Sequence, residues 1–377
     1  DQPRSRGLGD VYKRQGILPE FSVAPHSEGK TNLQVNVPEN GKCYLKLTYH
    51  LKKEMPLLEE DYILGFDEIE VSQKDAKCQL AEKWVEKTVT DSELQVSEDD
   101  TQIHIKGREF VYTIDRRTAL FTEMKFAGRE YLNHPMELNI WRAPTDNDMY
   151  IKSEWKKAHY DKAYTRAYTT EVVQGKHGVK ITSHASVVAE TVQKILDVTI
   201  TWKIEAAGKI DADIAVTKDD EFPDLPRFGV RMFLDKKLSA ARYFGMGPQE
   251  SYCDKHQATS HGLYQANVDD LHEDYIRPQE NGSHYDCEYV ELNNSRYGIV
   301  VSAENAFSFN ASYYTQEELE EKTHNYELIE SDSVVFCVDY ALNGIGSNSC
   351  GPVVLEQYRF DDVLFRFQFT LIPYVKG

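Results

Sequence analysis

The side chains of this sequence alternate between apolar and polar from residue 16 onward, and this period of two constrains the fold more than any other feature. A clear example is Cys43–Leu51 (CYLKLTYHL), which is rich in tyrosine and leucine. Strict alternation is typical of β-strands, and clusters of Gly, Asn, Asp and Pro separate the runs as in antiparallel sheets. The chain is therefore predicted to be all-β. Further strands are expected at 101–114, 179–188, 195–204, 210–216, 228–234, 298–302, 333–340 and 363–373.

Helical signals are few, and the strands fall into two groups. Short helices are expected at Gln316–Thr323 and at Tyr150–Lys157. A polar, acidic stretch at 88–100 predicts a linker or a solvated sheet edge. We expect a partial Ig-like β-sandwich at 16–90 and one large antiparallel sandwich at 91–377.

The composition excludes several classes of partner. A formal net charge of −19 opposes binding to nucleic acids and to anionic membrane surfaces. The six cysteines are far apart and form no C-x-x-C pair, so neither a zinc ribbon nor a dense disulfide framework is indicated. No apolar run reaches the roughly 18 residues of a membrane helix. A cytoplasmic protein with reduced thiols, with no nucleic-acid or membrane partner, is the simplest interpretation.

The first 15 residues differ in character from the rest. Residues 1–15, ending in GDVYKRQ, resemble translated sequencing-adapter read-through. We expect them to be a non-native leader and expect the native protein to continue upstream of Gly16.

One short segment combines several groups that suit a polyhydroxylated ligand. Residues 141–148 (WRAPTDND) supply a flat indole, a guanidinium, and the carboxylates and amide of Asp146, Asn147 and Asp148. These three side chains are candidate substrate contacts. The same residue types also form ordinary turns, and Arg142 beside an aspartate is commonly a structural ion pair.

Four further polar segments are expected in loops, where they would either contact a sugar or tie loops to the sandwich through buried networks. They are 245–255 (GMGPQESYCDK), 277–286 (RPQENGSHYD), 307–314 (FSFNASYY) and 343–352 (NGIGSNSCGP).

Familiar catalytic motifs are missing from the sequence. There is no G-x-S-x-G elbow and no H-E-x-x-H, and G-x-G fragments are not followed by a predicted helix. Glu288 lies in an alternating run that predicts a strand with exposed charge. Cys350, between Ser349 and Gly351, is either a reactive thiol or a small residue that fills a tight loop.

Taken together, the segments at 141–148, 243–255, 277–286 and 344–352 resemble, in order and spacing, the carboxy-terminal region of the large bacterial β-galactosidases of glycoside hydrolase family 2. The resemblance covers nearly all of residues 16–377. It implies an Ig-like domain followed by an antiparallel supersandwich of the galactose mutarotase-like type.

The resemblance also implies that catalysis belongs to another part of a longer enzyme. Members are retaining glycosidases acting on terminal β-D-galactosides such as lactose, and their two catalytic glutamates lie in an upstream barrel with magnesium and sodium. We therefore expect no catalytic residue, metal site or cofactor in this chain and no activity from it alone. The intact enzyme is expected to be a homo-oligomer that binds a β-galactoside.

Within the resemblance, the loop at 344–352 completes the active site with an aromatic residue that stacks on the sugar. Cys350 occupies that position here, so acceptor binding is expected to differ. The predicted substrate contacts are thus Cys350 and Asn348 together with Asp146, Asn147 and Asp148. Tyr150 stands where some members have a flexible glycine, which puts closure of the adjacent loop in doubt.

Two other functions stay open at this stage. One is a stand-alone carbohydrate-binding module, or a small subunit that complements a separate catalytic chain. The other is an aldose mutarotase, which needs a histidine acid and a glutamate base. His261, His284 and Glu250 offer the residue types, although the motif pattern of that family does not match.

Overall fold

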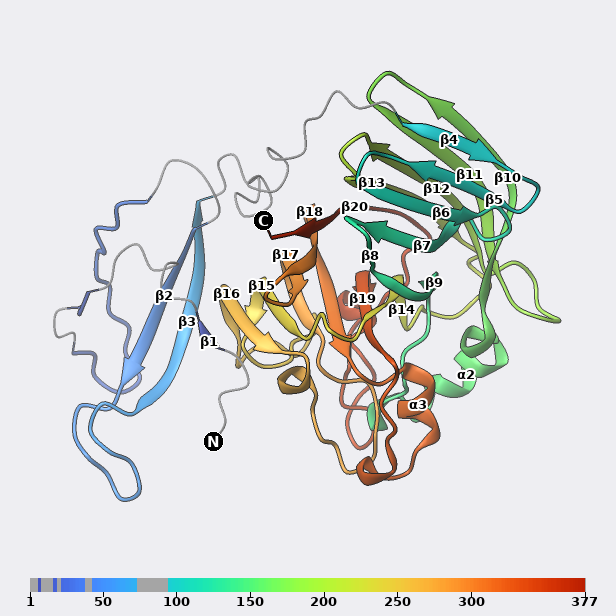
Figure 1. Cartoon of the computed structure of the whole chain (residues 1–377). Helices are drawn as coiled ribbons and strands as arrows, with labels where there is room; N and C mark the ends of the chain where they lie inside the picture. Colours follow the sequence, from blue (N-terminus) through green and yellow to red (C-terminus); the bar gives the residue numbers. More distant parts are fainter. Residues whose placement is uncertain (1–5, 8–15, 19–21, 38–42, 73–93, 377) are drawn as a thin grey trace. The chain divides into compact units, whose positions relative to one another are not determined.

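The computed structural model describes residues 6–7, 16–18, 22–37, 43–72 and 94–376 (Figure 1). The chain divides into two compact units, residues 8–79 in one and residues 1–7 with 80–377 in the other. In the smaller unit, the described strands β2 (Cys43–His50) and β3 (Ile63–Ser72) form an antiparallel pair. The predicted Ig-like sandwich stays a prediction, because its segment 73–93 lies outside the described residues, as does most of the predicted leader.

The larger unit is built from two antiparallel sheets. The first has five strands in sequence order, β4 to β8, and the second has thirteen strands along the path β1-β16-β15-β17-β18-β20-β13-β12-β11-β10, with β9, β14 and β19 joined beside it. The predicted all-β class and the large antiparallel sheet are confirmed. The strands of this unit are β1 (Arg6–Gly7), β4 (Gln95–Glu98), β5 (Gln102–Lys106), β6 (Phe110–Asp115), β7 (Leu120–Phe126), β8 (Arg129–Glu130), β9 (Leu132–Asn139), β10 (Tyr164–Gln174), β11 (Gly178–Val188), β12 (Leu196–Glu205), β13 (Ile210–Lys218), β14 (Arg227–Asp235), β15 (Ala240–Gly247), β16 (Ser260–Asn267), β17 (His284–Asn293), β18 (Tyr297–Ser312), β19 (Ser333–Leu342) and β20 (Leu364–Val375).

The two sheets pack against each other through alternating apolar side chains. Trp202 of β12 is fully buried, its ring lies 4.9 Å from that of Phe121 on β7, and its indole N–H donates to the carbonyl of Ala119 at 2.8 Å. The hydroxyl of Tyr112 on β6 donates to the carbonyl of Gly208 at 2.7 Å. One continuous hydrophobic core therefore joins both sheets.

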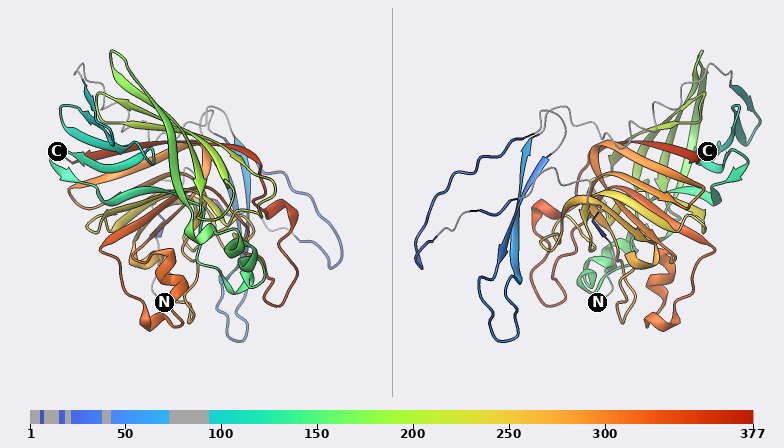
Figure 2. Two further views of the ribbon diagram at one scale, coloured as in Figure 1. Left: turned by 90° about the vertical axis from the view of Figure 1, so that its right-hand side faces the viewer. Right: turned by 60° about the vertical axis from the view of Figure 1, so that its left-hand side comes forward.

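Both predicted helices are present, as α2 (Ile151–Lys157) and α3 (Gln316–Glu321). They lie side by side at one end of the larger unit (Figures 1 and 2), joined by an ion pair between Lys156 and Glu320. Short 3-10 turns complete the described structure: η3 (Asp146–Asp148), η4 (Tyr160–Lys162), η5 (Asp269–Leu271), η6 (Asn325–Glu327) and η7 (Glu356–Tyr358). None of the described helices is long and apolar enough to cross a membrane.

Three expectations about local structure are wrong. The single strand expected at 101–114 is a hairpin, because the chain turns between β5 and β6, which pair antiparallel. Residues 307–312, expected in a loop, form the second half of β18, where Asn310 donates to the carbonyl of Asn281 at 2.5 Å. Glu288 lies in a strand as predicted, but its charge is not exposed, since it and Glu291 are buried on β17. β17 pairs with β15 and β18 along its two edges, and consecutive side chains from Cys287 to Leu292 are buried, so both of its faces are covered. Glu291 accepts a hydrogen bond from Tyr289 at 2.8 Å.

Candidate functional site

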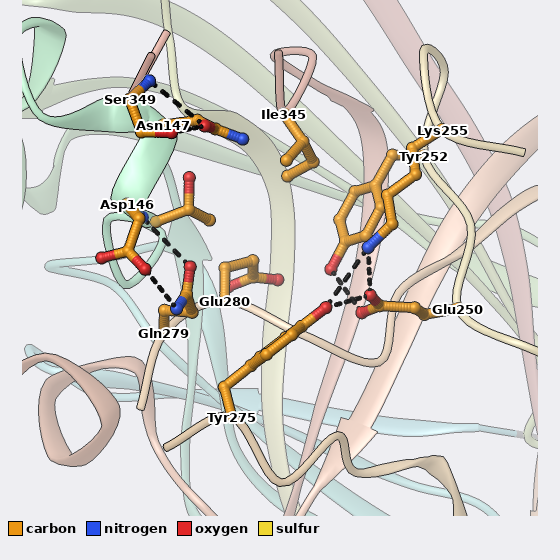
Figure 3. A pocket seen from close by; sticks show the side chains of 11 residues that line it. Asp146, Asn147, Glu250, Tyr252, Lys255, Tyr275, Gln279, Glu280, Ile345 and Ser349 are labelled. Atoms are coloured by element: carbon orange, nitrogen blue, oxygen red, sulfur yellow. Dashed lines mark hydrogen bonds and ion pairs between the residues drawn. The ribbon is translucent and has the colours of Figure 1, made fainter. Parts of the chain in front are cut away.

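Four segments that are far apart in sequence line one polar cavity of about 290 Å³ (Figure 3). They are the four motifs at 141–148, 243–255, 277–286 and 344–352, joined by Tyr275. The lining residues of these motifs lie in loops at strand ends, after β9, after β15, before β17 and after β19. The lining residues are Thr145, Asp146, Asn147, Glu250, Tyr252, Lys255, Tyr275, Gln279, Glu280, Ile345 and Ser349.

The first motif is anchored by a buried ion pair. Arg142 is fully buried, and its guanidinium donates to Asp148 through Nε at 3.1 Å and Nη2 at 2.7 Å. The same carboxylate accepts from the backbone N–H of Thr145 at 2.8 Å, which shapes the η3 turn. Arg142 also donates to the carbonyls of Asn343 and Gly344, so it ties the first motif to the fourth.

The three predicted contacts of the first motif have different environments, because Asp148 belongs to this buried ion pair. Asp146 and Asn147 line the cavity, whereas Asp148 is buried and its oxygens are engaged by Arg142 and Thr145. Asp146 faces Gln279, because its backbone N–H donates to Oε1 of Gln279 at 3.0 Å (Figure 3). Gln279 thus belongs to the cavity, although only its motif, and not the residue itself, was singled out from the sequence.

The loop after β19 is held by two side chains from other motifs. Asn147 donates to the carbonyl of Gly346 at 2.7 Å and accepts from the hydroxyl of Ser349 at 2.8 Å. Asp254 accepts from the backbone N–H of Ile345 at 2.9 Å and of Gly346 at 2.7 Å. Gly346 has φ of 65°, a left-handed conformation that favours glycine. Asp254 and Asn147 therefore hold the loop at Gly346, and Asn147 also holds it at Ser349.

The two remaining predicted contacts lie on this loop but do not line the cavity. Cys350 is exposed and Asn348 is partly exposed, and the backbone N–H of Cys350 donates to the carbonyl of Ser347 at 3.2 Å. Their contact with substrate stays a prediction. All five cysteines among the described residues are free thiols, and Cys78 lies outside that part of the chain.

Glu250 is the centre of a charged network on one wall of the cavity (Figure 3). Its carboxylate contacts Lys255 Nζ at 2.5 Å, the hydroxyl of Tyr275 at 2.5 Å and the backbone N–H of Gly282 at 2.9 Å. Burial alone would raise the pKa of Glu250, but the hydrogen bonds from Lys255 and Tyr275 outweigh it and hold the pKa below its ordinary value. Glu250 is therefore an anion with its oxygens engaged.

Glu280 forms the floor of the cavity in a different environment. It is buried, and both of its oxygens lie 3.3 Å from Nη1 of Arg227, which also binds Asp339 at 2.6 Å. One guanidinium thus serves two carboxylates. Burial is the largest influence on Glu280 and raises its pKa, against the opposing pull of Arg227 and Arg142.

Metal ligands and the histidine of a mutarotase were the remaining groups to place. Among the described residues, no group of three or more His, Cys, Asp or Glu side chains is placed to hold a metal ion. His284, considered for a mutarotase, is buried against the rings of Tyr243 and Phe309. It lines neither this cavity nor a second cavity that shares Tyr252 with it. Burial lowers the pKa of His284 to about 4.

The fold and this cavity define an all-β protein with a polar pocket assembled from four loops. Comparison with protein families adds a match to "Beta galactosidase small chain" over residues 106–371. The chain belongs to this family, which confirms the resemblance to β-galactosidases.

Relatives and solved structures give the scale of the likeness. The chain is 42% identical to a β-galactosidase of Actinobacillus pleuropneumoniae over 93% of its own length and 34% of the relative. It is 31% identical to a β-galactosidase of Staphylococcus xylosus over 94% of its length and 35% of the relative. The chain thus spans about one third of these relatives. Galactose 1-epimerase from Lactobacillus acidophilus aligns with a TM-score of 0.40 and 8% identity, over 77% of this chain and all of that one.

Proposed function

We propose that this chain is the carboxy-terminal part of a β-galactosidase that hydrolyses terminal non-reducing β-D-galactose residues with retention of configuration. In this proposal the cavity completes an active site whose two catalytic glutamates, with magnesium and sodium, lie in a barrel outside this chain. The intact enzyme would be a cytoplasmic homo-oligomer. The observation that carries the proposal is the meeting of all four motif segments at one cavity.

The cavity chemistry supports a binding role over a catalytic one. Retaining glycosidases need a free acid and a free nucleophile roughly 5 to 5.5 Å apart. Here Glu250 is engaged by Lys255 and Tyr275, and Glu280 by Arg227. The exposed carboxylate of Asp146, the second amide hydrogen of Asn147 and the second lone pair of Gln279 Oε1 offer the donors and acceptors that sugar hydroxyls require.

The proposal is tested by incubating the purified chain with a chromogenic β-galactoside. No galactose release is expected from the chain alone, and measurable release would overturn the assignment of catalysis to another segment. Joining the chain to the remaining portion of the Actinobacillus relative should restore hydrolysis.

A second candidate is a small subunit that complements a separate catalytic chain, favoured by the description of the matching family as a small chain. Capture of a separately encoded, barrel-bearing chain from the source organism would support it. Titration with galactose and lactose would reveal a stand-alone binding module.

A further inference from the structure

A second cavity of about 320 Å³ adjoins the first, and Tyr252 lines both. It is formed by parts of β17, β18 and β19 and by residues 357–362. Its volume falls within the range of small-molecule sites, roughly 300 to 1,000 Å³. The motifs at 243–255 and 277–286 supply part of its lining, but the proposed hydrolysis does not use this cavity.

Aromatic rings with fixed orientations form part of its wall. Tyr340 stacks on Phe365 with ring centroids 4.8 Å apart and planes at 15°, and it also contacts buried Phe360 at 5.9 Å. Tyr285 stacks on His256 at 5.7 Å. Rings supported in this way present flat apolar faces with little loss of freedom on binding, which suits the C–H face of a pyranose.

Polar groups of this wall are available to a ligand. The hydroxyls of Tyr285, Tyr340 and Tyr358 make no hydrogen bond to another residue within 94–376, and the same holds for the carboxylate of Asp362 and the amide of Gln357. In the first cavity, by contrast, Glu250 and Tyr275 bond to one another. The second cavity therefore offers both hydroxyl donors and carboxylate and amide acceptors.

The local charge selects the class of ligand. Asp286 and Asp362 line the cavity with a single cation, Arg359, whose Nε donates to the carbonyl of Val354 at 3.1 Å. Asp286 pairs with His261 at 2.9 Å. Asp362 has no cationic partner among the described residues. This excess of negative charge, in a chain of net charge −19, opposes phosphorylated or carboxylated ligands.

The backbone at this cavity is also irregular. Asp286 has φ of 53°, a left-handed conformation that is uncommon outside glycine, and the pairing of β17 with β18 shifts register on both sides of Cys287. Irregularities of this kind re-aim side chains and occur often beside binding sites.

We propose that the second cavity is a carbohydrate site for a neutral hexopyranoside, stacked on Tyr340 and hydrogen-bonded by Asp362, Gln357 and the tyrosine hydroxyls. This site is independent of whether the intact enzyme hydrolyses galactosides. It would hold a sugar unit beside the first cavity without taking part in bond cleavage.

The test is calorimetric titration of the 377-residue chain with methyl β-D-galactopyranoside and methyl β-D-glucopyranoside. Saturable binding of at least one glycoside is expected. The double variant Asp362→Ala with Gln357→Ala should weaken it at least about tenfold, the effect of losing a hydrogen bond to a charged group. Both positions are exposed, so the fold should persist, as thermal unfolding would verify.

Two control variants locate the binding. Glu356→Ala removes a neighbouring exposed carboxylate that does not line the cavity and should leave affinity unchanged. Asp146→Ala with Gln279→Ala alters the first cavity and should leave this affinity in place. The proposal is overturned by absence of saturable binding, by loss of binding in the first-cavity variant alone, by equal weakening in Glu356→Ala, or by tighter binding of a sugar phosphate.

Discussion

Breaking the Arg142–Asp148 pair should destabilise the larger unit strongly, because both side chains are buried. Asp148 is 2% exposed, and its carboxylate binds two nitrogens of a fully buried guanidinium. In Asp148→Asn, Arg142 keeps its charge but loses the carboxylate bonded to it, and the nearby Glu280 is already paired with Arg227. Removing one member of a buried pair typically costs about 3 to 5 kcal/mol. We expect a loss of that size in the free energy of unfolding.

A matched surface pair provides the control for this experiment. Lys157 and Glu154 lie 2.8 Å apart, but their side chains are 73% and 57% exposed. Glu154→Gln should therefore cost about 0 to 1 kcal/mol. Urea denaturation, followed by tryptophan fluorescence, measures both losses.

A double-mutant cycle identifies the cause. Arg142→Met combined with Asp148→Asn should cost clearly less than the sum of the single variants, because the uncompensated charge is then gone. The reasoning is refuted if Asp148→Asn costs no more than Glu154→Gln, or if the two buried substitutions are additive.

Three further predictions concern pH and the loop after β19. Since the pKa of His284 is lowered to about 4 in the folded chain, the unfolded chain takes up a proton first as the pH falls. Stability should therefore fall by about 3 kcal/mol between pH 6.5 and pH 4, and denaturation curves of His284→Phe should lack this component. Because the pKa of Glu280 is raised, the folded chain keeps this proton to a higher pH than the unfolded chain does, and stability should fall as the pH rises above the ordinary glutamate value. Glu280→Gln should flatten that part of the stability profile, and an unchanged slope would contradict the assignment. In an active enzyme carrying this chain, Asp254→Asn should raise KM for lactose more than it lowers kcat, because Asp254 positions Ile345 and Gly346 rather than any reacting atom.

The alternation of side chains predicted many of the strands, although not β3, β7, β9, β10, β15 or β16, and both helices were expected. The expected runs at 179–188, 195–204 and 210–216 coincide closely with β11, β12 and β13, which have one buried side chain in every two along most of their length. The helices at α2 and α3 were found because their short polar sequences interrupt this period.

Two of the errors arose where both faces of a strand are covered. The charged residues of β17 predict solvent exposure, but Glu291 is accommodated by Tyr374, which comes from β20 near the end of the sequence. No local pattern contains such a contact. The polar residues at 307–312 were misassigned for the same reason, since Asn310 is satisfied by Asn281 across the fold.

The candidate site was predicted in part. Motif chemistry identified Asp146 and Asn147, which line the cavity, but it could not separate them from Asp148, because only the fold shows that Asp148 serves Arg142. Gln279 meets Asp146 across 133 positions of sequence, and residue type alone does not indicate that pairing. The distant motifs could be grouped only by their shared resemblance to one family.

The most direct test of the central claim replaces the matching third of the Actinobacillus β-galactosidase with this chain and measures lactose hydrolysis. The account predicts an active chimera, with KM raised at least about tenfold by Asn147→Ala combined with Gln279→Ala, the effect of two lost hydrogen bonds. Tyr326→Ala, at a 79% exposed position outside the cavity, should leave KM unchanged. A well-folded chimera whose kinetics ignore the cavity substitutions would contradict the claim that this cavity completes the active site.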